Sequence, residues 1–197
     1  MTKKDIIDFF DKCAPSWDEE MIRDDEIIAF ILDKAQITEG KDILDVACGT
    51  GVLIPDYKKR NVKSITAIDI SSEMAKITKE KFADVDVEVI CADVETQEFE
   101  KKFDCIMVYN AFPHFPNPEK LIRSLVSHLK NGGTLTVAHG MSRAQIDACH
   151  KGSASKVSRG LLSEDELAEI FEKYLQLSIK ISDDKMYQIT GILNENS

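Results

Sequence analysis

Five short runs of apolar residues recur along the chain and predict the strands of a buried sheet. They are rich in valine and isoleucine, and they lie at 42–48, 64–70, 86–93, 103–110 and 133–140. Strands that are buried on both faces of a parallel sheet are apolar almost throughout, whereas half-exposed strands alternate apolar with polar residues. The pattern therefore predicts a parallel sheet that is covered on both sides.

Stretches with helical spacing of apolar residues separate these runs. Residues 18–35 place five apolar side chains on one helical face, namely Ile27, Ile28, Ile31, Leu32 and Ala35. Residues 71–83 and 117–130 are also compatible with helices, and the following Asn131-Gly132-Gly133 is typical of a helix C-terminus. The alternation of strands and helices predicts a doubly wound α/β fold.

The C-terminal part of the chain predicts one more helix and a hairpin. Residues 163–174 begin with a capping box formed by Ser163 and Glu166. Two apolar runs follow, at 175–182 and 185–192, with a short acidic turn between them. We therefore expect the sheet to finish with two antiparallel strands.

Length and composition indicate one globular domain. The chain has 197 residues, of which 43% are hydrophobic and 30% are charged, and no linker or repeat divides it, so we expect 1–197 to form a single domain. The net charge of -10 argues against nucleic acid as a partner. The absence of an apolar leader and of any long apolar run predicts a cytoplasmic protein without a membrane span. Nothing in the sequence indicates the oligomeric state.

The five cysteines fit neither a disulfide framework nor a zinc ribbon, because their number is odd and no CxxC pair occurs. Cys91 and Cys105 lie within predicted strands. We expect both to be buried as small hydrophobic residues.

The turn after the first predicted strand has the composition of a cofactor-binding loop. The sequence LDVACGTG brings Gly49 and Gly51 to the start of a helix, where residues without a Cβ let a ligand approach backbone N–H groups. The dinucleotide fingerprint would require glycine or alanine at position 54, which is Ile54. A nicotinamide cofactor is therefore disfavoured.

Three carboxylates are associated with three successive strands. They are Asp45, Asp69 and Asp93, and Asp69 lies 18 residues beyond Gly51, near the position at which an acid binds ribose hydroxyls in folds of this kind. A single acid after a strand is more often a turn former or helix cap. Three in order indicate a binding site at one sheet edge.

Taken together, these motifs resemble those of the class I S-adenosylmethionine-dependent methyltransferases. The matching segments are LDVACGTG, AIDIS, CADV and FDCIMVYNAFPHF, and the resemblance covers about residues 5–190. The opening FFDKCAPSWDEEM is similar to the N-terminal segment of the quinone-biosynthesis C-methyltransferases and their relatives in the type 11/25 group. The resemblance implies a mostly parallel, seven-stranded Rossmann-like sheet with an antiparallel last strand, and residues 1–35 as a helical cap.

The resemblance also implies residues that bind S-adenosylmethionine. Asp45, Ala47, Gly49 and Gly51 would hold its methionine end, Asp69 its ribose, Ile70 and Met74 the faces of its adenine, and Asp93 and Val94 the adenine edge. Trp17 would close over the cofactor, and Asn110 would contact the cofactor or the acceptor. Met74 also fits a core position by its helical spacing.

Two histidines are candidates for the base that accepts a proton from the methyl acceptor. His114 and His139 lie just beyond predicted strand ends, where open α/β proteins build their sites. Phe112 and Phe115 flank His114 and are expected to line the acceptor side. The alternative for His114 is a loop histidine bonded to a carbonyl, and we expect His128 to pack on a helix.

The segment 139–162 is long enough to be a substrate-side insertion. Its sequence SRAQIDACH predicts a short helix capped by Ser142. Three hypotheses remain open: an acceptor pocket in which Arg143 recognises an anionic group, a surface lid, and a metal site. The metal ligands would be His114, His139, His150 and Cys149.

The function that these observations favour is methyl transfer from S-adenosylmethionine to a small-molecule acceptor. One alternative is a metal-dependent methyltransferase, or one that acts on a thiol or metalloid. Another is a cofactor-binding regulator without catalysis.

Overall fold

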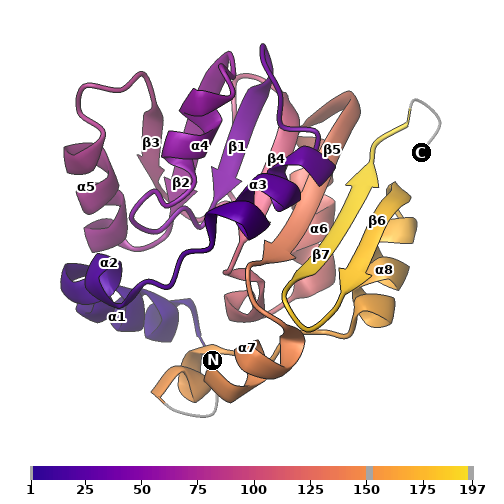
Figure 1. The fold of residues 1–197 in the computed structure, drawn as a ribbon. Helices are drawn as coiled ribbons and strands as arrows, with labels where there is room; N and C mark the ends of the chain where they lie inside the picture. Colours follow the sequence, from indigo (N-terminus) through magenta and orange to yellow (C-terminus); the bar gives the residue numbers. More distant parts are fainter. Residues whose placement is uncertain (1, 150–152, 195–197) are drawn as a thin grey trace.

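The computed structural model describes residues 2–149 and 153–194, and these form a seven-stranded sheet with the order β3-β2-β1-β4-β5-β7-β6 (Figure 1). The strands are β1 (Asp42–Val46), β2 (Ser64–Asp69), β3 (Glu88–Cys91), β4 (Phe103–Tyr109), β5 (Leu129–His139), β6 (Gln176–Ser182) and β7 (Tyr187–Ile192). Strands β1 to β5 are mutually parallel, and β7 runs antiparallel to both β5 and β6. The predicted fold class and the terminal hairpin are confirmed.

Helices cover both faces of the sheet. The helices α3 (Asp25–Lys34) and α4 (Ile54–Lys59) cover one face, and α6 (Pro118–Ser127) and α8 (Glu164–Glu172) the other, while α5 (Ser72–Lys81) packs beside β2 and β3. Strand β1 shows why: Leu44 and Val46 belong to one apolar core and Ile43 to the other, since neighbouring strand residues point to opposite faces. Within the described ranges no helix is both long and apolar enough to cross a membrane.

Several short elements gather where the parallel strands end. Helices α1 (Lys3–Cys13) and α2 (Trp17–Glu20), joined by the turn η1 (Ala14–Ser16), form what we call the N-terminal cap. Figure 1 shows the cap and α7 (Arg143–Cys149) at the same end of the sheet. The turns η2 (Phe112–His114) and η3 (Ser153–Val157) complete the set of elements. Open α/β proteins place their ligands at this edge.

The structure corrects the helix predicted over 18–35. Helix α2 ends at Glu20 and α3 begins only after Asp24, whose carboxylate accepts the N–H groups of Glu26 and Ile27, both at 3.0 Å. The apolar spacing in this region belongs to α3 alone, because Asp24 satisfies the first N–H groups of a new helix.

The structure also corrects the helix C-terminus predicted at Asn131-Gly132-Gly133. Helix α6 already ends at Ser127, and the three residues lie in an irregular part of β5. The N–H of Gly132 donates to the carbonyl oxygen of Leu193 at 2.7 Å, and the N–H of Leu193 donates to the carbonyl oxygen of Gly133 at 2.9 Å. The residues after β7 therefore supply the partners that a helix cap would have supplied.

Of the two cysteines predicted to be buried, Cys105 is buried and Cys91 is exposed. Cys91 ends β3, which lies at the edge of the sheet, so the covering that buries the central strands is incomplete there.

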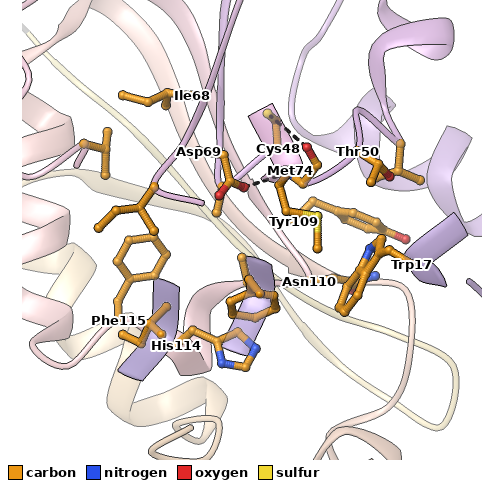
Figure 2. Close-up of a pocket in the computed structure, with 18 of the residues that line it drawn as sticks. Trp17, Cys48, Thr50, Ile68, Asp69, Met74, Tyr109, Asn110, His114 and Phe115 are labelled. Carbon is orange, nitrogen blue, oxygen red and sulfur yellow. Dashed lines mark hydrogen bonds between the residues drawn. The ribbon is translucent and has the colours of Figure 1, made fainter. Parts of the chain in front are cut away.

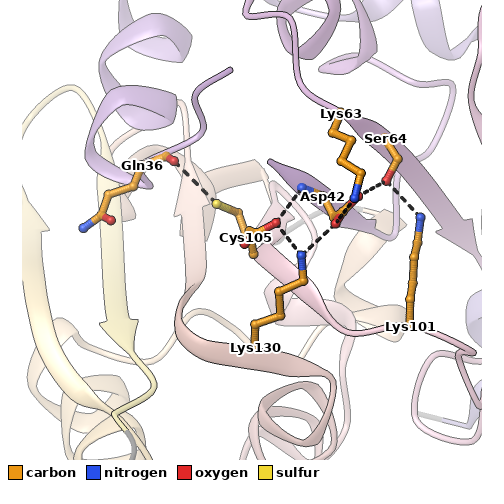
Figure 3. A network of polar contacts seen from close by, with 8 residues as sticks. Gln36, Asp42, Lys63, Ser64, Lys101, Cys105 and Lys130 are labelled. Atoms are coloured by element: carbon orange, nitrogen blue, oxygen red, sulfur yellow. Dashed lines mark hydrogen bonds and ion pairs between the residues drawn. The ribbon is translucent and has the colours of Figure 1, made fainter. Parts of the chain in front are cut away.

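A polar network at the opposite end of the sheet holds the amino ends of the central strands together (Figure 3). Lys130 of β5 donates to Asp42 of β1 at 2.7 Å and to Asp104 of β4 at 2.8 Å, and Ser64 of β2 donates to Asp42 at 2.7 Å. Burial alone would raise the pKa of Asp42, but the hydrogen bonds from Lys130 and Ser64 outweigh it and lower that pKa to about 2. One lysine thus fixes the relative positions of three strands.

Replacing Lys130 by methionine is expected to lower the free energy of unfolding by about 1 kcal/mol at neutral pH, because two partly buried carboxylates lose a charged donor. The depressed pKa of Asp42 means that its contribution is full above the unfolded pKa of about 4 and is lost as the pH falls towards 2. Urea unfolding at several pH values measures both effects. Lys173→Met is the control, since the pair with Glu119 is about half exposed and should contribute little. Equal losses in the two variants would contradict the assignment.

Candidate functional site

A cavity of about 520 Å³ lies at the carboxyl ends of the parallel strands (Figure 2). Residues that follow β1, β2, β3, β4 and β5 line it, together with residues of the N-terminal cap, the segment before α3, and α7. Its volume falls within the usual range for ligand sites, about 300–1,000 Å³. The strand order reverses between β1 and β4, so the cavity occupies the switch point of the sheet.

The turn after β1 is shaped by residues with positive φ. Ala47, Gly49 and Gly51 have φ values of 53°, 55° and 81°. A Cβ built on Gly49 would be in ordinary van der Waals contact with Trp17 Nε1 at 3.9 Å, whereas one on Gly51 would lie 2.6 Å from a ring carbon of Phe82. Gly49 therefore leaves room in the cavity, and Gly51 lets the turn pack against the protein.

Asp69 connects this turn to the end of β2. Its Oδ2 accepts the N–H of Gly49 and its Oδ1 that of Ser71, both at 2.8 Å. Burial raises the pKa of Asp69, while the two backbone donors oppose the rise. The carboxylate lines the cavity with its position fixed from both sides, which suits the recognition of adjacent hydroxyl groups.

The end of β3 contributes Asp93 and Val94 to the cavity wall, where Ile70 and Met74 also lie. Lys3 of the cap forms ion pairs with Asp93 and, at 2.8 Å, with Glu95. Met74 is 1% exposed and also lines the cavity. Its position is therefore compatible with both predictions made for it, a core residue and a contact of the adenine.

Polar contacts attach the N-terminal cap to the elements below it. Asp18 accepts hydrogen bonds from Thr50 at 2.5 Å and from Lys81 at 2.6 Å. Asp11 accepts one from Ser71 at 2.5 Å. These contacts hold Trp17 and Phe10 of the cap over the cavity, and both side chains line it.

Both candidate base histidines line the cavity. His114 in η2 has its Nδ1 2.7 Å from the carbonyl oxygen of Val157, and its ring packs edge-on against Phe10 with 4.9 Å between centroids. His139 ends β5, is 2% exposed and packs against Tyr187. His128 packs against Phe99 on a different part of the protein, as predicted.

Four predicted site residues are not among the residues that line the cavity. Asp45 and Phe112 are buried in the protein interior, and Gly51 packs against Phe82. Arg143 lies on α7 with its Nε 4.0 Å from Asp147 of the same helix. The expected anion recognition by Arg143 and acceptor contact by Phe112 do not match this arrangement, because Phe112 packs in the apolar core and Arg143 is not among the residues that line the cavity.

The metal hypothesis gains no support from the described residues, among which no group of three histidine, cysteine or acidic side chains could hold a metal ion. His150 and the side chain of Cys149 lie outside the described residues. Ser142 does cap α7 as predicted, since its Oγ accepts the N–H of Gln145 at 3.3 Å.

Sequence reasoning missed several wall residues, among them Phe10, Arg23, Tyr109, Met141 and Ile146. Phe10 and Tyr109 lie within the motif segments and could have been found from those segments. Arg23 and Met141 come from short connecting segments and Ile146 from the short helix α7, and their direction depends on tertiary packing, so local patterns carry no signal for them.

The fold and the cavity define an α/β protein with a ligand site at the switch point of its sheet, where open α/β proteins bind nucleotides and related cofactors. Residues 43–133 match a family model described as a methyltransferase domain. The malonyl-acyl-carrier-protein O-methyltransferase of Priestia megaterium is 31% identical over 140 residues, which are 69% of this chain and 50% of that protein. N-methyltransferase 4 of Papaver somniferum is 35% identical over 135 residues, 64% of this chain and 36% of that protein.

Among solved structures, magnesium protoporphyrin IX methyltransferase from Synechocystis PCC 6803 with bound SAH has the same fold, with a TM-score of 0.73 and 13% identity over 98% of this chain and 99% of that one. Over residues 43–133 the chain thus matches the methyltransferase domain family, and in fold it is similar to S-adenosylmethionine-dependent methyltransferases. It spans half or less of the two curated relatives described above.

Asp45 yields a prediction about stability. Burial raises its pKa to about 7, the charge of Asp69 adds to the rise, and Tyr57 opposes it. A raised pKa gives stability that is complete below the unfolded pKa of about 4 and is lost as the pH rises through 7. Asp45→Asn cannot ionise, so its stability relative to the wild type should increase between pH 4 and pH 8. One pKa unit is about 1.4 kcal/mol, so the change is on the order of a few kcal/mol.

Chemical unfolding of the ligand-free protein across this pH range measures the difference. Asp184→Asn, in the exposed turn between β6 and β7, is the control and should show no such trend. A constant difference between Asp45→Asn and wild type would refute the raised pKa.

Proposed function

We propose that this protein transfers a methyl group from S-adenosylmethionine to a small-molecule acceptor that binds in the same cavity. The observation that carries the proposal is the division of the cavity wall. Asp69, Ile70 and Asp93 lie at or near the ends of β2 and β3, whereas His114 follows β4 and His139 ends β5. The site thus has separate places for a nucleoside and for an acceptor.

The cofactor fits the residues that are present. The missing side chain at Gly49, below Trp17, leaves room for its methionine end, and Asp69 is available to accept hydrogen bonds from its ribose hydroxyls. Asp93, Val94, Ile70 and Met74 are expected to surround the adenine, and Trp17 and Asn110 to lie near the methionine end. Ala47 contributes backbone in the same turn.

The cofactor supplies the methyl group: the acceptor lone pair bonds to the methyl carbon, the carbon–sulfur bond breaks with its electrons going to sulfur, and the acceptor proton goes to a base. The chain must exclude water and align the acceptor. The cap and α7 provide the cover, since Phe10 and Ile146 both face the cavity.

His114 is our proposal for that base. A carbonyl oxygen can only accept, so the contact with Val157 places the ring proton of neutral His114 on Nδ1 and its basic lone pair on Nε2. The same contact fixes the orientation of the ring. His139, buried at the end of β5, is proposed to position the acceptor.

Calorimetric titration and an assay of S-adenosylhomocysteine release test the proposal. The wild type should bind the cofactor in a 1:1 ratio and release product in the presence of a suitable small acceptor. His114→Ala should lower turnover about 100-fold or more, as expected for loss of a general base, while cofactor affinity stays nearly constant. His139→Ala should raise the KM for the acceptor more than it lowers kcat.

His128→Ala is the control and should change neither quantity, because His128 packs against Phe99 outside the cavity. Equal losses of cofactor affinity in His114→Ala and His139→Ala would show that the roles are wrongly assigned. Tight cofactor binding with no product from a broad acceptor panel would instead identify a regulator without catalysis.

A further inference from the structure

The acceptor half of the cavity differs chemically from the cofactor half. It is formed by the residues after β4 and β5, by α7, and by the segment between α2 and α3. Its wall includes Met21, Ile22, Phe115, Met141 and Ile146. These side chains offer apolar contact surface and no hydrogen bonds.

Two lysine or arginine side chains line the cavity within the described residues, and both are engaged with carboxylates. Lys3 pairs with Asp93 and Glu95 on the cofactor half. Arg23 donates to Asp25 and Asp56, both at 2.6 Å, and to the carbonyl of Val52 at 2.7 Å. Its three guanidinium nitrogens are thus directed at the protein, so Arg23 supports the wall and offers little to an anion.

The carboxylates that line the cavity also lie on the cofactor half, at the ends of β2 and β3. In the described part of the chain they are Asp69, Asp93 and Glu95, and all three follow β2 or β3. Among the described residues, the acceptor half therefore presents no carboxylate to a cationic amine. A charged acceptor would lose its hydration there without gaining an opposite charge, which is unfavourable.

Apart from the histidines and Arg23, whose guanidinium is engaged with the protein, the described polar side chains nearest the acceptor half are neutral. Burial raises the pKa of Tyr109 to about 12, so its phenol stays protonated at physiological pH. Gly140 makes room for that hydroxyl, because a Cβ at this position would lie 2.4 Å from it. Asn110 accepts the N–H of Gly140 at 3.1 Å and so joins the ends of β4 and β5.

We propose that the acceptor is an uncharged, mainly apolar molecule about the size of a substituted ring, which presents one O–H or S–H group for methylation. The inference rests on the proposed function and adds the substrate class to it. The oxygen or sulfur lone pair of the acceptor attacks the methyl carbon. The electrons of the carbon–sulfur bond pass to the cofactor sulfur, and the O–H or S–H proton of the acceptor passes to His114. The hydroxyl of Tyr109 and the ring of His139 would orient the polar end.

Three ligands that share a propyl-substituted benzene ring and differ in the charge of their polar group test the proposal: para-propylphenol, para-propylbenzoate and para-propylbenzylamine. Each is titrated at pH 7 by calorimetry into protein saturated with S-adenosylhomocysteine. The neutral phenol should bind at least about tenfold more tightly than the carboxylate or the ammonium. Equal or tighter binding of either charged ligand, or no binding of the phenol, would overturn the proposal. Failure of the saturating cofactor product to bind would instead overturn the proposed function.

A charge placed in the wall should change the preference. Met141→Arg puts a cation on the acceptor half and is expected to raise benzoate affinity and lower phenol affinity, each by about fivefold or more. Ile22→Arg serves as a second variant, because Ile22 lines the cavity but is 87% exposed and can be replaced without loss of folding.

The control is Ala144→Arg, which adds the same charge to an exposed position of α7 outside the cavity wall. It should leave the order of affinities for the three ligands unchanged. Cofactor-product affinity, measured on every variant, reports correct folding. An unchanged preference in both cavity variants would mean that these ligands bind elsewhere, and the proposal would fail.

Discussion

The hydrogen bond from the Gly49 N–H to Asp69 is the interaction on which the site depends. It joins the ends of β1 and β2, and the other oxygen of the same carboxylate accepts the N–H of Ser71, at the start of α5. The hydroxyl of Ser71 in turn donates to Asp11 of the N-terminal cap. The glycine turn, the acidic residue and the cap are therefore positioned by one connected set of contacts. Small displacements of Asp69 would move all three.

The contacts around Asp69 require buried carboxylates and strained backbone, and the rest of the sheet offsets the stability that these cost. Asp69 and Asp45 are both buried near the turn, and burial raises the pKa of each. Ala47 and Asn110 also adopt positive φ, at 53° each, where residues other than glycine are strained. The polar network around Lys130 and the two apolar cores hold the strands in place, so that strain and buried acids are tolerated at the opposite end.

The strands, their alternation with helices and the terminal hairpin could be predicted, because apolar periodicity is a local property of the sequence. The break at Asp24 was missed because an acid in an amphipathic pattern resembles a surface residue until its side chain is seen to cap a helix. Asn131-Gly132-Gly133 has the composition of a helix cap, but its backbone partners come from Leu193, which is far away in the sequence.

The part of the cavity wall at the ends of β2 and β3 was predictable for the same reason. Asp69 ends β2 and Asp93 lies two residues beyond the end of β3, so the edge of the sheet that carries them is determined once the strands are known. The acceptor half was predicted less completely, since His114 and His139 reach the cavity but Phe112 and Arg143 do not. Phe112 and Arg143 lie on the short helical elements η2 and α7. A small rotation of such an element about its axis decides whether a side chain faces the core, the solvent or the cavity. That rotation depends on packing rather than on local sequence.

A crystal structure of the protein with S-adenosylhomocysteine tests the central claim most directly. The account predicts the ribose hydroxyls at Asp69, the adenine near Asp93 and Val94, and the sulfur at the switch point between β1 and β4, facing His114 and His139. An adenosine moiety in the half of the cavity formed by β4, β5 and α7, or a ligand bound outside the cavity, would contradict it.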